Sequence, residues 1–95
     1  MLPVLPQDVS TVARALLLEA EPQRSTLCQM LLDRAELAAR HVARTGRLHP
    51  HWGNGSLDAA ARQSSALATE PPWNNPSYIN CLILILQELQ RRSAP

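Results

Sequence analysis

The longest apolar run of the chain spans residues 78–89 and reads Tyr-Ile-Asn-Cys-Leu-Ile-Leu-Ile-Leu-Gln-Glu-Leu. It is too long for an ordinary single strand and shows no alternation of apolar and polar residues, so it predicts a helix. Because almost every position is apolar, we expect this helix to be buried on most of its circumference, with other helices covering it. The run therefore predicts an all-α, single-domain four-helix bundle with a central apolar C-terminal helix.

Length and aromatic content agree with one helical domain. The chain has 95 residues, which is enough for one domain and leaves no room for a second. Its aromatic residues are Trp52, Trp73 and Tyr78, and phenylalanine is absent. The core must therefore consist of Leu, Ile, Val and Ala, which suits packed helices better than a sheet. We expect one domain with an extended segment at residues 1–7 and a tail at residues 93–95.

Breaker and capping residues divide the chain into four expected helices. Their expected ranges are residues 8–20, 22–45, 57–67 and 76–92. Pro3 and Pro6 should keep the first residues from starting a regular element. The expected N-caps are Asp8, Ser56 and Asn75, and Gly46 is the expected stop of the second helix. The chain thus predicts short connections and one long helix in its first half.

Overall charge gives no general attraction to nucleic acid or to membranes. The formal net charge is +1, and all nine cations are arginines. Cys28 and Cys81 fall on apolar helical faces, so we expect buried thiols in a reducing cytoplasm. The apolar run is shorter than the ~20 residues needed to cross a bilayer. Residues 1–7 lack the features of a signal peptide. We therefore expect a soluble cytoplasmic protein with no membrane partner.

A basic cluster lies on the later half of the second expected helix and on the loop after it. Its members are Arg34, Arg40, Arg44, Arg47, His41, His49 and His51. One interpretation is a solvated charged face, because Asp33 and Glu36 continue the same edge and Glu36 can pair with Arg40. The other is a surface for phosphate or an acidic partner, since arginine is a planar, permanently charged donor. The sequence leaves both open.

The loop at residues 47–55 carries side chains that could do chemistry. Its histidines could ligate a metal, but no Cys or acid stands at a recognised metal spacing from them, so hydrogen bonds that position the loop are favoured. Ser56 has neither the G-x-S-x-G pattern of a nucleophile nor the G-K-[ST] ending of a phosphate loop. Trp52 should anchor the loop in the helical core or stand exposed as a contact residue. We expect no enzyme activity, no metal and no cofactor.

The run His-Pro-His-Trp-Gly-Asn-Gly-Ser-Leu at residues 49–57 resembles the most distinctive motif of a family of short bacterial proteins of unknown function. The opening Leu-Pro-Val-Leu-Pro-Gln-Asp-Val and the closing Pro-Ser-Tyr-Ile-Asn-Cys segments are similar too, so the resemblance covers most of the chain. It implies a protein that accompanies phage-like DNA-packaging genes, as in gene transfer agents, where a small terminase subunit is short, helical and oligomeric. The chain departs from ordinary small terminases, because no N-terminal helix-turn-helix is found.

These observations predict a non-enzymatic assembly or adaptor protein. It would self-associate and contact a motor protein or DNA, as a small terminase-like DNA-packaging subunit does. The residues expected to bind DNA or a partner are Arg34, Arg40, Arg44, Arg47, His49, His51, Trp52 and Asn54. The alternative is a monomeric regulatory protein that binds one protein partner through the Trp52 loop.

Overall fold

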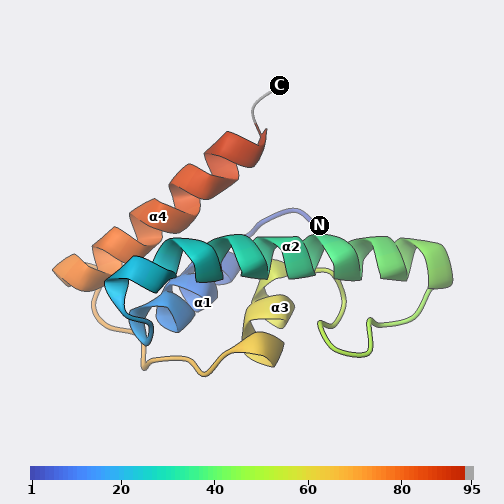
Figure 1. The fold of residues 1–95 in the computed structure, drawn as a ribbon, viewed down its shortest axis with the longest axis horizontal. Helices are drawn as coiled ribbons and strands as arrows, with labels where there is room; N and C mark the ends of the chain where they lie inside the picture. Colours follow the sequence, from blue (N-terminus) through green and yellow to red (C-terminus); the bar gives the residue numbers. More distant parts are fainter. Residues whose placement is uncertain (94–95) are drawn as a thin grey trace.

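A computed structural model describes residues 1–93, and Figure 1 shows that they fold into helices joined by short connections. The helices are α1 (Pro6–Leu17), α2 (Glu21–Thr45), α3 (Leu57–Ser64) and α4 (Pro76–Ser93). The described residues contain no strand, and their one isolated β-bridge joins His49 to Gly53. The predicted all-α four-helix architecture is confirmed. Of the expected tail, Ser93 belongs to α4, and residues 94–95 lie outside the described part.

α1 occupies the centre of the molecule. It contacts α2, α3 and α4, whereas α3 and α4 do not touch each other. In Figure 1, α1 lies beneath the left half of α2, with α4 rising diagonally away. Val12, Ala13 and Leu16 of α1 are fully enclosed, because each faces one of these neighbours. The core is therefore built around a helix near the start of the chain.

The expectation that the C-terminal helix is buried on most of its circumference is wrong. α4 buries Tyr78 and Ile85 on the side that faces α1 and α2. On its other side, Ile79, Ile83 and Leu86 keep 36%, 46% and 53% of their surface exposed. The reason is the arrangement of the helices: α4 contacts α1 and α2 but not α3, so no helix covers its other side.

Several helix boundaries differ from those expected, and α1 ends at Leu17 instead of residue 20. α1 begins at Pro6 rather than Asp8, because proline is suited to the first helical position, where its missing N–H has no intrahelical partner to lose. α3 ends at Ser64 instead of Leu67. After it, the Ala68 N–H donates to the Arg14 carbonyl at 3.2 Å, and Arg14 Nε donates to the Ala68 carbonyl at 2.7 Å. These bonds to α1 replace further turns of α3.

The expected N-cap Asp8 is instead the third residue of α1, whose N-cap is Leu5. The expected caps Ser56 and Asn75, the stop at Gly46 and the buried cysteines are confirmed. Ser56 caps α3 by accepting the Ala59 N–H at 3.1 Å. The Asn75 side chain accepts the Tyr78 N–H at 3.0 Å at the start of α4. Gly46 ends α2 in the left-handed region with φ 70°. Cys28 and Cys81 are both buried and free.

A buried carboxylate joins α1 to α3. Asp8, the third residue of α1, accepts the Leu5 N–H at 2.7 Å and the Asp58 N–H at 2.8 Å. Thr11 donates from its hydroxyl to the Asp58 carboxylate. Asp8 thus satisfies one free N–H at the start of each helix, and these donors would otherwise be buried without partners.

Replacing Asp8 tests this link. An Asp8→Asn chain keeps the shape but turns one acceptor oxygen into an NH₂ that faces a backbone N–H. We expect the free energy of unfolding to fall by about 1–3 kcal/mol, the cost of a buried donor left unsatisfied. Urea denaturation measures it, with the exposed Glu19→Gln as control. Equal stability of the two variants would contradict the role given to Asp8.

Candidate functional site

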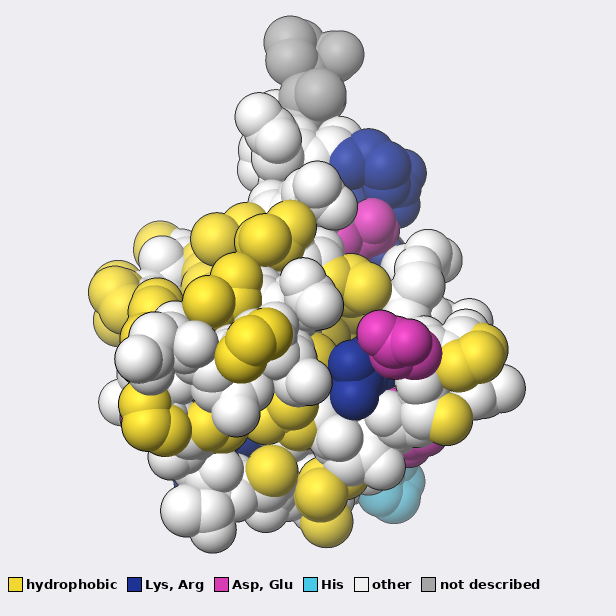
Figure 2. Space-filling view, turned by 90° about the vertical axis from the view of Figure 1, so that its left-hand side faces the viewer, with side chains coloured by type: hydrophobic (Ala, Val, Ile, Leu, Met, Phe, Trp, Pro, Cys, Tyr) yellow, Lys and Arg dark blue, Asp and Glu magenta, His cyan; other side chains and the backbone are white. Residues whose placement is uncertain are grey.

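A continuous apolar surface runs along the uncovered side of α4. Its large exposed side chains are Leu5, Trp73, Ile79, Ile83 and Leu86, which we call the α4 apolar face. Figure 2 shows hydrophobic side chains gathered on the left of the molecule, with charged side chains to the right of them. Leu5 and Trp73 are 62% and 57% exposed, so the face extends from α4 onto the segments beside it.

The α4 apolar face combines a groove and a ridge. The groove has a volume of about 510 Å³ and lies between α4 and the start of the chain. It is lined by Val4, Leu5, Pro6, Val9, Trp73, Leu82, Leu86 and Leu89. The ridge consists of Ile79, Ile83 and Leu86, which follow the four- and three-residue spacing of one helical side. Leu86 belongs to both, so ridge and groove are adjacent.

No charged side chain lines this groove. The charges of α4 are committed elsewhere: Glu88 pairs with Arg91, and Arg92 pairs with Glu88 at 3.0 Å and Asp33 at 2.9 Å. These ion pairs lie toward α2. The uncovered side of α4 is therefore an apolar surface, and the charged side chains of α4 lie away from it.

The loop after α2 is organised by His49. Its Nδ1 accepts the N–H groups of His51 at 3.1 Å and Trp52 at 3.2 Å. Its ring stacks on Trp52, with centroids 4.6 Å apart and planes 10° from parallel. The Arg34 guanidinium lies over the Trp52 ring at 5.3 Å. Trp52 therefore anchors the loop to the surface of α2, and it is not part of the buried core.

Other residues expected to bind a partner hold the loop together. The Asn54 side chain accepts the Ser56 N–H at 2.9 Å and shapes the entry to α3. His51 donates its N–H to His49 and is otherwise exposed. The Arg47 N–H donates to the Thr45 hydroxyl at 3.1 Å, and its side chain is exposed. The structure does not gather the eight expected residues at one point.

Four of the basic residues do come together. Arg40, His41, Arg44 and His49 line a hollow of about 280 Å³ with Leu37, which we call the basic hollow. The predicted pair between Glu36 and Arg40 is wrong. Glu36 instead accepts the N-terminal ammonium of Met1 at 3.0 Å, because the start of the chain folds back over α2. Neither Arg40 nor Arg44 has an ion-pair partner within residues 1–93.

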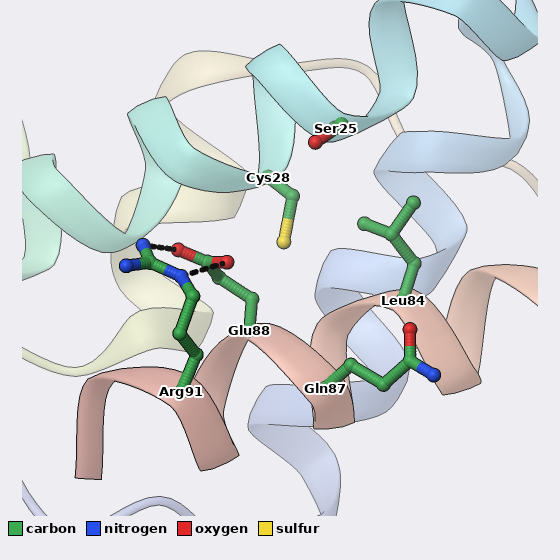
Figure 3. A pocket seen from close by; sticks show the side chains of 6 residues that line it. All are labelled: Ser25, Cys28, Leu84, Gln87, Glu88 and Arg91. Atoms are coloured by element: carbon green, nitrogen blue, oxygen red, sulfur yellow. Dashed lines mark hydrogen bonds and ion pairs between the residues drawn. The ribbon is translucent and has the colours of Figure 1, made fainter. Parts of the chain in front are cut away.

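A third hollow, of about 250 Å³, lies between α2 and α4. Figure 3 shows the Cys28 thiol directed toward it, with Glu88 and Arg91 hydrogen-bonded at one side. Burial raises the pKa of Cys28 to about 12, so its thiol stays protonated. The hydrogen bond from Arg91 lowers the pKa of Glu88 to about 2 despite partial desolvation. These groups form an ion pair beside an unreactive thiol.

Within residues 1–93, no three His, Cys, Asp or Glu side chains are placed to hold a metal ion together. Across the same part of the chain, every helix is too short or too polar to span a bilayer.

Comparison with known proteins places the chain in a family. The model of a domain of unknown function, DUF7742, matches residues 2–89, which is most of the chain. The chain belongs to the DUF7742 family. The resemblance to a family of short proteins of unknown function is thereby confirmed. Neither a curated protein nor a solved structure matches the chain. Family membership alone therefore supplies no activity.

Sequence reasoning missed the α4 apolar face. It expected the helix of residues 78–89 to be buried on most of its circumference. A usable signal was present, because the apolar positions circle much of this helix and a neighbouring helix covers only the side that it faces. Leu5 and Trp73 gave no such signal, since only the tertiary structure brings them beside α4.

The close approach of the loop to α2 generates one prediction. Gly55 has φ +99°, and a Cβ on it would lie 2.8 Å from Ala39 Cα. Gly46 has φ +70° but no atom near its missing Cβ. We expect Gly55→Ala to lower the free energy of unfolding by about 1–3 kcal/mol more than Gly46→Ala, since only the former overpacks a contact. Urea denaturation of both variants measures the difference, and equal effects would contradict it.

The His49 contacts generate a pH prediction. Partial burial, then the charges of His41 and His51, lower the pKa of His49 below 6.5. The unfolded chain therefore binds this proton more readily than the folded chain, so stability should fall as pH drops below 6.5 and level off below the folded pKa. Protonation of Nδ1 also removes the acceptor for the His51 and Trp52 amides. NMR titration should place the His49 midpoint below 6.5, and a higher midpoint would refute the assignment.

Proposed function

We propose that this protein is a non-enzymatic assembly module that pairs with a second copy of itself through the α4 apolar face. The observation that carries the proposal is the exposed row Ile79, Ile83 and Leu86 beside an apolar groove of about 510 Å³. Monomeric soluble proteins rarely expose contiguous apolar patches above a few hundred Å², and larger ones mark interaction surfaces. Burial of this row would remove three large apolar side chains from water.

The shape of the face favours a second copy as its partner. A two-fold contact places the same patch of both chains together, so the patch must complement itself. The α4 apolar face meets this condition, because the ridge of one copy can enter the groove of the other, with Leu86 near the axis. The groove has no charged lining residue, so the pairing brings no like charges together.

The side chains that could act in catalysis are better explained by structural roles. Ser56 and Asp8 cap helices, and burial keeps the Cys28 thiol protonated. Free buried thiols at Cys28 and Cys81 are also consistent with a cytoplasmic protein. These assignments support an interaction protein over an enzyme.

The finer form of the proposal is a DNA-packaging adaptor. In this form, copies joined through α4 would present Arg40, Arg44 and Arg47 to DNA or to a motor protein. Its support is the resemblance to small terminase-like proteins of gene transfer agents and the lack of acidic partners for Arg40 and Arg44 within residues 1–93. The competing proposal is a monomer that binds one protein through the Trp52 loop, and oligomeric state separates the two.

Light scattering coupled to size-exclusion chromatography tests self-association. The single chain has a mass of 10.5 kDa, and we expect twice this mass at high concentration, with dissociation on dilution. Leu86→Glu should raise the dimer Kd by at least about 100-fold, because it would bury an unpaired charge that costs several kcal/mol.

The matched control is Leu48→Glu, which makes the same change at an exposed leucine in the loop after α2. It should leave the mass unchanged. Circular dichroism should give the same helix content for both variants. A mass of 10.5 kDa for the unaltered chain at every concentration would refute self-association and favour the monomeric alternative.

A further inference from the structure

We propose that the basic hollow is a phosphate-binding site. Its walls are Arg40 and Arg44 on α2, His41 between them, and His49 from the loop. Arg40 and Arg44 are four residues apart, so their guanidinium groups extend from the same side of the helix. The ligand would be a phosphate group, either free phosphate or the phosphodiester of a nucleic acid. Paired guanidinium forks bind this tetrahedral anion through several charged hydrogen bonds.

The positive charge of the hollow is not neutralised from within the described chain. The two nearest acids upstream on α2 are engaged with other cations: Asp33 with Arg92 at 2.9 Å, and Glu36 with the Met1 ammonium at 3.0 Å. Among residues 1–93, no carboxylate lines the hollow. In the folded chain, Asp33 and Glu36 thus pair with other cations and do not neutralise the arginines of the hollow.

His49 adds a neutral donor. Its Nδ1 accepts two backbone N–H groups and cannot carry a proton at the same time. In the neutral ring the proton is therefore on Nε2, which faces away from these amides and can donate to an anion. The T-shaped contact between His41 and His49, with centroids 5.1 Å apart, brings the second imidazole to the same place. The lining side chains offer hydrogen-bond donors, and none is acidic.

Contacts within the chain hold the loop side of the hollow in place. The His49–Gly53 bridge closes the loop with a 2.8 Å hydrogen bond from the His49 N–H to the Gly53 carbonyl. Stacking of Trp52 on His49 then fixes the imidazole plane. Because the donor from the loop is already held in place, binding would order mainly the two arginine side chains, which limits its entropic cost.

This inference rests on the DNA-packaging form of the proposed function, in which an arginine surface binds a partner, and it identifies the bound group as a phosphate. It does not depend on pairing through α4. Repeating the phosphate measurement on Leu86→Glu distinguishes failure of the phosphate site from failure of self-association. Phosphate binding that persists in this variant would establish the site as independent of self-association.

Titration with inorganic phosphate, followed by the imidazole resonances of His41 and His49, tests the site. We expect saturable shifts that sodium chloride at equal ionic strength does not reproduce. Arg40→Gln and Arg44→Gln should each weaken binding by at least about tenfold, because each removes charge-assisted hydrogen bonds. Arg91→Gln is the control, since this arginine already pairs with Glu88 on α4. Absence of saturable shifts, or equal weakening by Arg91→Gln, would overturn the proposal.

Duplex DNA of random sequence distinguishes the two sources of phosphate. If the site takes backbone phosphates, DNA should compete with inorganic phosphate. Its affinity should also fall with salt, with a slope of about 0.9 per phosphate contacted in a plot of log K against log salt. Arg44→Gln should reduce this slope by about one. If inorganic phosphate binds and DNA does not compete, the site serves a free phosphate group.

Discussion

The enclosure of α1 by the other three helices is the contact on which the rest of the structure depends. α1 is only 12 residues long, yet α2, α3 and α4 all contact it. Asp8 adds a directional link, because its carboxylate holds the start of α1 and the start of α3 together. Of the other helices, α4 contacts α1 and α2 but not α3. The α4 apolar face is therefore a consequence of which helices pack against α4.

At the other end of the molecule, the length of α2 leaves a polar surface accessible. α2 has 25 residues, and the last that it buries is Ala38. Beyond this point it extends past the other helices, accompanied by the loop that leads to α3 (Figure 1). Gly55 can approach Ala39 because neither presents a large side chain. The polar end of α2 thus stays accessible to solvent. The basic hollow forms there, between α2 and the loop that follows it.

Particular residues show how far the candidate site could be predicted from the sequence. The clustering of Arg40, Arg44 and His49 was predictable, because helical spacing and a short loop keep them close. The fate of Glu36 was not, since the Met1 ammonium that binds it is 35 positions away in the chain. Arg34, expected on the same basic surface, lies over the Trp52 ring. For Glu36, a contact between distant segments replaced the one that local spacing favoured.

The sequence by itself determined the helical class, the number of helices and most of their ends. Residues such as Gly46, Ser56 and Asn75 act on their own backbone, so their effect does not depend on what lies nearby. Only the tertiary structure decided which side of α4 is covered and which cations of α2 keep a free charge. Those properties depend on which segments lie beside each helix. Periodicity along one helix gives its apolar arc, but it does not say how much of that arc a neighbouring helix will cover.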